Sequence, residues 1–211
     1  NSKEAQAEMT VLEKLSTSLN EGKAVRQVNL TAEEVELVRP LGLLTGKPVI
    51  YATNVSEDDL AAGNERVDQV RQITATQQAK VVVVSAQVES ELVELPESER
   101  ADFLAALGVE EGGLKSLITA TYELLGLRTY LTTGPQETRA WTIYAGMKTP
   151  QAAGVIHSDF ERGFIRAETI NYQDLVTVGA MNVAKEKGLV RSEGKDYIVQ
   201  EGDVMLFRFN V

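Results

Sequence analysis

The feature that most constrains the fold is a short apolar run that ends in a polar turn. Residues 48–53 include the unbroken apolar run Val49-Ile-Tyr-Ala52, which is typical of a parallel strand covered on both faces. The turn that follows, Asn54-Val-Ser-Glu57, lies where α/β proteins bind ligands, at the carboxyl end of a strand. A second apolar run, residues 81–84, ends in the polar sequence Ser85-Ala-Gln87. Since the residues between the runs have a helical pattern, we predict a right-handed βαβ unit with both turns at one edge.

The first of these turns has two interpretations. Asn54-Val-Ser-Glu57 resembles the base-reading motif Asn-Lys-x-Asp of P-loop GTPases, with two positions altered. In that motif the Asp carboxylate accepts two hydrogen bonds from guanine. Glu57 is one methylene longer, and a displaced carboxylate need not repel the bare N1 of adenine, so these residues favour adenine. The alternative is a simple helix start, with Ser56 as the cap and Asp59 at position N3.

Composition limits the compartment and the partners. The chain has no cysteine, which excludes disulfides and zinc–thiolate sites and suits a reducing cytoplasm. No apolar run approaches the ~18 residues of a membrane span, so we expect no membrane partner. Residues 139–211 hold nine basic and nine acidic side chains, so the whole net charge of −10 comes from residues 1–138. We therefore expect any RNA contact in the balanced back half. The start, which lacks both an initiator Met and a signal peptide, is expected to be a cut into a longer protein.

Periodicity and caps predict the remaining elements of the front half. Ala5, Met9, Leu12, Leu15 and Leu19 form a narrow stripe on a helix over residues 3–21. This stripe fits one arm of an antiparallel coiled-coil hairpin and equally an ordinary amphipathic surface helix. A capping box, Thr31 with Glu34, opens a short helix. Further helices are predicted over residues 58–79, 87–94, 97–107 and 114–125.

The back half changes to short strands. Strands are predicted over residues 128–133, 139–144, 163–171, 197–199 and 204–210, and helices over residues 150–157, 172–177 and 181–187. Two strands, a helix and then more strands is the order of a small α+β grasp. The fold class is thus α/β followed by α+β.

Several segments together resemble the YchF / Obg-like ATPase family. The most specific are residues 150–168 (PQAAGVIHSDFERGFIRAE) and 194–211 (GKDYIVQEGDVMLFRFNV), supported by residues 43–57, 84–92 and 139–143. The resemblance implies three parts. Residues 1–22 would be one arm of a helical hairpin, 23–127 the C-terminal part of a Ras-like G (OBG-type) domain, and 128–211 a ubiquitin-like TGS domain.

The same resemblance implies a function. Family members bind and hydrolyse ATP in preference to GTP, are cytoplasmic and associate with ribosomes. The residues expected to contact the base are Asn54, Val55, Glu57, Ser85 and Ala86. The sequence holds neither the Gly-rich phosphate loop with its Lys and Ser/Thr nor the switch regions with the family's catalytic His. Ligands for Mg²⁺ are therefore expected outside these residues, and we predict that this chain alone does not hydrolyse ATP.

An alternative function from another class remains open. The chain would then act as a non-catalytic ribosome- or RNA-binding module, or as a regulatory TGS module. Lys148, Arg162 and Arg166 could form a small basic face for RNA, although interleaved acids favour a solvated mixed surface. His157, the single histidine, is predicted to be structural, and Trp141 is predicted to lie in the core.

Overall fold

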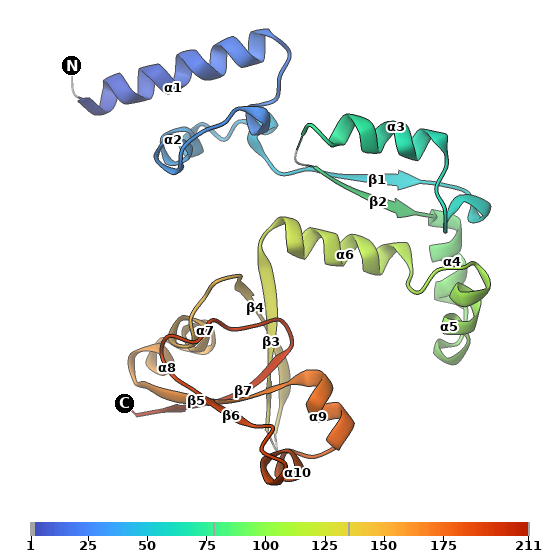
Figure 1. Ribbon diagram of the computed structural model, residues 1–211, viewed down its shortest axis with the longest axis vertical. Coiled ribbons are helices and arrows are strands. Elements are labelled where there is room, and N and C mark those ends of the chain that lie inside the picture. The colour runs from blue at the N-terminus through green and yellow to red at the C-terminus, as the bar shows by residue number, and fades with distance from the viewer. Residues whose placement is uncertain (1–2, 78, 135, 211) are drawn as a thin grey trace. The chain divides into compact units, whose positions relative to one another are not determined.

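The computed structural model describes residues 3–77, 79–134 and 136–210. The chain divides into two compact units, residues 1–124 and 125–211, each of mixed α/β composition (Figure 1). Within the described residues, no helix has both the length and the apolar character needed to cross a bilayer.

The first unit begins with a helix packed on an irregular segment. Helix α1 (Lys3–Asn20) buries Val11 and Leu15 against Val25. The predicted stripe is wrong at Ala5, Met9 and Leu19, which are exposed, and right at Leu15. Val11 is buried instead, because the face that contacts the rest of the unit is rotated from the most regular apolar row. The segment that follows contains η1 (Val25–Gln27), α2 (Ala32–Val38), η2 (Arg39–Leu41) and η3 (Leu44–Gly46).

The predicted capping box at the start of α2 is confirmed. The Glu34 backbone N–H donates to the Thr31 hydroxyl at 3.2 Å, and the Thr31 N–H donates to the Glu34 carboxylate at 2.7 Å. Two of the amides that a helix start leaves unpaired are satisfied in this way.

The predicted order of strand, helix and parallel strand is confirmed, with a helix shorter than the predicted residues 58–79. Strand β1 (Ile50–Asn54) is followed by η4 (Glu57–Asp59) and α3 (Glu65–Thr74), and β2 (Lys80–Val84) pairs with β1 in parallel. Helices α3 and α6 (Gly113–Leu124) both contact β2, from opposite sides in Figure 1. Because two strands are few for a sheet, these helices supply most of its apolar cover.

Two helices complete the unit beyond the second strand. Helix α4 (Ala86–Glu94) begins directly after β2, and α5 (Glu97–Ala106) follows Pro96. Leu60, Val88 and Leu92 form a buried cluster beside the sheet. This cluster holds the segment after β1 against the start of α4, which fixes the two strand-end turns.

The second unit is a five-stranded sheet with helices. Its strand order is β4-β3-β7-β5-β6, and β7 lies parallel to β3 but antiparallel to β5. The strands are β3 (Leu127–Thr133), β4 (Thr138–Tyr144), β5 (Phe164–Asn171), β6 (Arg191–Glu193) and β7 (Asp203–Phe209). The helices are α7 (Thr149–Ile156), α8 (Ser158–Arg162), α9 (Tyr172–Val178) and α10 (Met181–Glu186). A core around Tyr130, Met205 and Phe207 fills one face, and Ile170, Ala184 and Val204 fill part of the other.

One predicted strand is wrong and another was missed. Residues 197–199 form only an isolated bridge between Ile198 and Lys148. The Asp203 carboxylate accepts hydrogen bonds from the Gln200 N–H and the Tyr197 hydroxyl, which holds this segment in a turn. Strand β6 is short and largely polar, so its sequence carries no alternating apolar signal.

Candidate functional site

The two strand-end turns meet at one edge of the β1–β2 sheet. Asn54 and Val84 are paired in the ladder, so the turns leave the sheet side by side. The Asn54 Oδ1 atom accepts a hydrogen bond from the Ala86 N–H at 2.9 Å. The Val55 N–H donates to the Val84 carbonyl, also at 2.9 Å. These two bonds fasten both turns into one polar edge.

The five predicted site residues differ in what they present at this edge. Asn54, Glu57 and Ala86 are exposed. The Val55 side chain packs on the buried cluster of Leu60, Val88 and Leu92, so only its backbone is available to a ligand. Ser85 is 1% exposed, and its hydroxyl accepts from the Val88 N–H at 3.5 Å as the N-cap of α4. Its side chain therefore holds the turn and does not face solvent.

The helix-start interpretation of the first turn also describes part of the structure. A short 3₁₀ helix begins at Glu57 with Ser56 at its N-cap. The Ser56 hydroxyl makes no capping bond to the backbone and donates to the Asp59 carboxylate at 3.1 Å. Asn64 donates to the same carboxylate at 2.8 Å. These two bonds to Asp59 thus hold the turn in place, while the Glu57 carboxylate remains exposed.

The edge presents several hydrogen-bonding groups close together. Asn54 retains its Nδ2 donor, Val55 presents a carbonyl acceptor, and Glu57 presents a carboxylate. Among the residues that the structure describes, no group of three or more His, Asp or Glu side chains could hold a metal ion.

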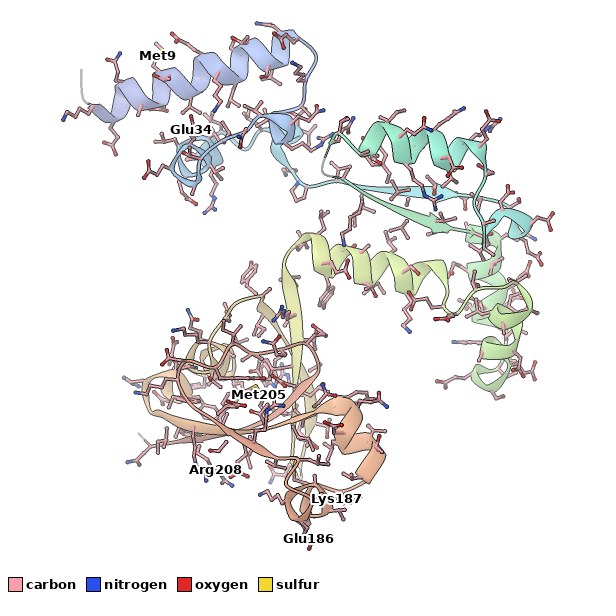
Figure 2. The ribbon with its side chains drawn as sticks, viewed as in Figure 1. Met9, Glu34, Glu186, Lys187, Met205 and Arg208 are labelled. Carbon is pink, nitrogen blue, oxygen red and sulfur yellow. The ribbon has the colours of Figure 1, made fainter. Side chains whose placement is uncertain are left out.

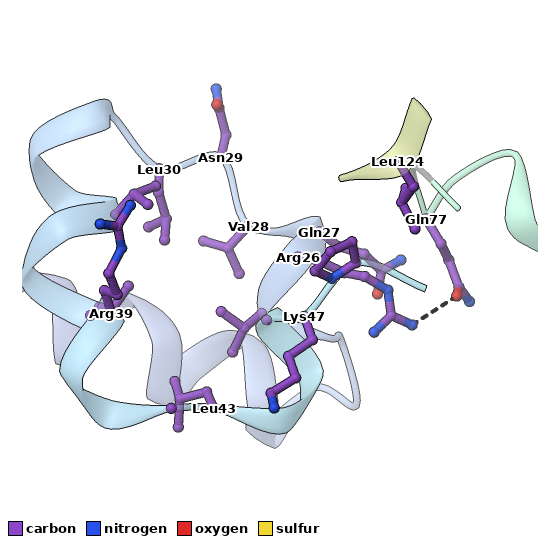
Figure 3. A pocket seen from close by; sticks show the side chains of 16 residues that line it. Arg26, Gln27, Val28, Asn29, Leu30, Arg39, Leu43, Lys47, Gln77 and Leu124 are labelled. Carbon is purple, nitrogen blue, oxygen red and sulfur yellow. Dashed lines mark hydrogen bonds between the residues drawn. The ribbon is translucent and has the colours of Figure 1, made fainter. Parts of the chain in front are cut away.

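A pocket elsewhere in the first unit is lined by none of the five predicted site residues. It has a volume of about 760 Å³ and lies between η1, α2 and the segment before β1 (Figure 3). Arg26 crosses it, with Nη2 donating to the Gln77 side-chain oxygen at 3.0 Å and Nη1 to the Thr45 carbonyl at 3.2 Å. The buried Arg26 Nε has no hydrogen-bond partner among the described residues. This pocket could not be predicted from the sequence, since its walls come largely from irregular segments.

The remaining predictions concern the second unit. His157 Nδ1 accepts from the Asp159 N–H at 3.2 Å and caps α8, which confirms a structural role. Trp141 is only partly buried, and its indole N–H donates to the Thr132 hydroxyl at 2.9 Å. Of the three candidate basic residues, Lys148 and Arg162 each pair with one carboxylate.

Arg166, the third candidate, has a different environment that sequence reasoning missed. It lies in a group with Lys185 and Arg208 around Glu168. The available signal was the spacing of Arg166 and Glu168, which places both on one face of a strand. The other two cations come from distant segments, and only the folded sheet brings them together.

Comparisons with known proteins give a family model that matches the second unit and relatives that match nearly the whole chain. The family model YchF-GTPase_C, described as "Protein of unknown function (DUF933)", matches residues 127–210. The chain is 54% identical over 211 residues to the Ribosome-binding ATPase YchF of Bacillus subtilis, covering 99% of this chain and 58% of that protein. It is 50% identical to the protein of the same name from Escherichia coli O157:H7, covering 99% and 57%. The chain thus spans less than three-fifths of the length of these relatives.

Solved structures resemble the chain as well. The structure of the Schizosaccharomyces pombe YchF GTPase matches with a TM-score of 0.80 and 33% identity, covering 99% of this chain and 57% of that one. A GTP-binding protein of Pyrococcus horikoshii OT3 matches with a TM-score of 0.55 and 16% identity, covering 98% and 70%, a likeness of fold alone.

Proposed function

Because the chain belongs to the YchF family, we propose that it supplies the base-recognition edge of a ribosome-associated nucleotide hydrolase, and that the base is adenine. The bacterial relatives are named ATPases, whereas the yeast structure is titled a GTPase. The choice between the two bases is therefore argued from the residues of the edge.

The observation that carries the proposal is the bond from Ala86 N–H to Asn54 Oδ1. This bond occupies the Asn54 Oδ1 atom and fixes the orientation of the amide. The Nδ2 donor is then available to an acceptor atom of a ligand. An adenine ring nitrogen is such an acceptor. A base-contacting asparagine fixed by the second turn is preorganised, which lowers the entropy lost on binding.

The free groups of the edge match adenine better than guanine. Guanine presents an oxygen acceptor at position 6, whereas adenine presents an amine donor there. The backbone N–H groups of Val55 and Ala86 already donate within the protein. If the Asn54 Nδ2 donor meets a ring nitrogen, the groups left to meet position 6 are the Val55 carbonyl and the Glu57 carboxylate, both acceptors, and acceptors pair with an amine and repel an oxygen.

We propose that phosphate binding and hydrolysis require residues other than the 211 of this sequence. ATP is the proposed cofactor, and its phosphates and Mg²⁺ would be held by a phosphate loop that this sequence does not contain. Hydrolysis would belong to the longer protein, and this chain alone would be inactive. We further propose a cytoplasmic, ribosome-bound protein whose second unit is a TGS domain of β-grasp type. A last strand parallel to the first, between two antiparallel pairs, supports that assignment.

Amide chemical shifts measured by NMR during titration with ATP and with GTP test the base site directly in this chain. We expect ATP to shift the amide signals of Asn54, Glu57 and Ala86, and GTP to shift them less. Larger shifts with GTP would overturn the adenine assignment. No shifts with either nucleotide, at concentrations far above a millimolar Kd, would overturn the site itself.

Glu57→Asp is the matching variant, since it shortens the carboxylate by one methylene. We expect it to move the preference toward GTP by several-fold, in line with the roughly 1–3 kcal/mol of a good base contact. Asp58→Asn is the control, because Asp58 is a neighbouring exposed acid. If both variants leave the ATP-to-GTP ratio unchanged, Glu57 does not face the base.

Ribosome association is tested separately by co-sedimentation of the chain with purified ribosomes. We expect the chain to pellet with ribosomes in the absence of nucleotide. If the chain stays in the supernatant at low salt, the ribosome part of the proposal fails, while the base site remains testable by the titration above.

A further inference from the structure

Strand β2 has one edge paired with β1 and one free edge. On the paired edge, the N–H of Lys80 and the carbonyl of Val84 bond to backbone groups that flank β1, at 3.4 and 2.9 Å. Alternate residues of a strand direct their N–H and C=O groups to opposite edges. The backbone groups of Val81 and Val83 therefore point away from β1, and they have no hydrogen-bond partner among the described residues.

A pocket of about 400 Å³ lies beside this free edge. Its lining includes residues 81–83 of β2 but no residue of β1. Helices α3 and α6 contact the sheet from opposite sides (Figure 2), and both reach the pocket, α3 through Arg71 and α6 through Gly113 and Ser116. A cavity bounded by both helices and by β2 alone lies beyond the edge of the sheet. The space next to the unpaired amides is therefore open to a ligand.

The edge itself is built like a template for another strand. The unpaired N–H and C=O groups of Val81 and Val83 alternate in the way that an extended chain can match. Proteins commonly block such edges with proline, a bulge or charged side chains. Residues 81–84 are four valines in regular register, and within β2 only Lys80, at its start, is charged. The side chains of β2 thus do little to prevent a further strand from pairing.

The surroundings of the free edge are strongly acidic. Residues 57–113, from the turn after β1 to the start of α6, hold thirteen acidic and four basic side chains. Glu110 and Glu111 line the pocket, and Glu110 is exposed and has no ion-pair partner among the described residues. The one basic residue of the lining, Arg71, is paired with Asp68 at 2.9 Å. A second copy of this chain would bring like charges together at this edge, whereas a basic segment would neutralise them.

We propose that the free edge of β2 binds an extended, basic peptide segment of a partner protein as an added strand. Successive side chains of a strand point to opposite faces, so the best segment alternates apolar and basic residues. Its apolar side chains would pack on Leu60, Ala61 and Val109 of the pocket. Its basic side chains would meet Glu110 and Glu111. This binding requires neither nucleotide nor ribosome, so it goes beyond the proposed function and stands or fails separately.

Fluorescence anisotropy with a labelled peptide, Arg-Val-Arg-Val-Arg-Val-Arg, tests the proposal on the full chain. Two further peptides carry N-methyl groups, one on its valines and the other on its arginines. The three have the same charge, but in an added strand only alternate N–H groups face β2. We expect one methylated peptide to bind at least about tenfold more weakly and the other to change less than about threefold. Equal effects of the two methylations, or no binding of the unmodified peptide, would overturn the proposal.

The acidic side chains of the pocket are tested by a matched pair of double variants. Glu110→Gln with Glu111→Gln should weaken binding of the unmodified peptide several-fold. Glu97→Gln with Glu99→Gln removes the same charge from exposed acids of α5 and should weaken it less than about twofold. Thermal unfolding followed by far-ultraviolet circular dichroism verifies that both variants fold. If the two pairs lose affinity equally, general attraction to an acidic protein explains the binding.

Amide hydrogen exchange followed by NMR locates the bound peptide. In the free chain, the amides of Val81 and Val83 should exchange faster than those of Val82 and Val84, which bond to β1. Saturating peptide should slow exchange at Val81 and Val83 by at least about tenfold. Unchanged exchange there would show that the peptide binds elsewhere. Protection that appears without peptide and rises with protein concentration would show that a second copy occupies the edge, and either result would overturn the proposal.

Discussion

The Tyr197 hydroxyl in the second unit lies between an acid and a cation. It donates to the Asp203 carboxylate at 2.8 Å and accepts from Arg191 Nη2 at 3.0 Å. Burial, and then the bond to Asp203, raise the pKa of Tyr197 from 10 to about 12. Asp203 itself is 1% exposed, and the same carboxylate accepts the Gln200 N–H. Ionisation of the Tyr197 hydroxyl would therefore disturb the turn that leads into β7.

The raised pKa predicts a loss of stability at high pH. The fold favours the neutral phenol, so this contribution is complete below about pH 10 and is lost as the pH rises toward 12. Phenolate absorbance should show a step near pH 12 that Tyr197→Phe removes. Tyr144→Phe, which alters an exposed ring, should leave that step in place. A step that survives Tyr197→Phe would contradict the assignment.

At the scale of elements, helix α6 approaches the sheet closely at Gly113. A Cβ atom built there would lie 2.9 Å from the Cα, Cβ and Cγ1 atoms of Val84, so backbone or helix must shift. We expect Gly113→Ala to cost about 1–3 kcal/mol, as over-packing of a tight contact does. Because Val84 leads into the Ser85-Ala86 turn, the variant should also reduce the shifts that ATP causes at that turn.

Gly112→Ala is the matched control for this contact. A Cβ there would lie 2.9 Å from Glu89 Oε1, the end of a flexible side chain that can rotate away. We expect a change within about 0.5 kcal/mol. Thermal unfolding followed by far-ultraviolet circular dichroism measures both variants. If they are equally stable, α6 does not rest on β2 at Gly113.

Elements with a local signal could be predicted from the sequence, and those fixed by distant contacts could not. The capping box at Thr31 and the apolar runs of β1 and β2 each act within a few residues, and all three were located. The polar strand β6 forms because it pairs with β5. Residues 197–199 form no strand because Asp203 holds them in a turn. Neither cause is visible in the local pattern.

The candidate site shows the same division. The position of Asn54 at a strand end follows from the apolar run before it. Its bond to Ala86, thirty-two residues away, depends on the parallel register of the two strands. The same limit explains Ser85, where the sequence indicates a polar turn residue but not that its hydroxyl is buried as the cap of α4.

At the scale of the whole molecule, the two units differ in how much core they bury. The largest fully buried side chains of the second unit include Tyr130, Ile143, Ile170 and Met205, whereas those of the first include Val67 and Val88. The first unit also depends on a two-stranded sheet, which is stable only through its helices. Since burial of apolar surface dominates stability, the first unit should be the weaker one.

We therefore predict that the chain unfolds on heating in two steps. Trp141, the single tryptophan, lies in the second unit and reports on that unit alone, while far-ultraviolet circular dichroism reports on both. Part of the dichroism signal should be lost before the fluorescence changes. Val67→Ala should lower the temperature of the first step, and Ile143→Val, at a cost of about 0.5–1.5 kcal/mol, only that of the second. Coincident transitions that both variants shift together would show that the units unfold as one.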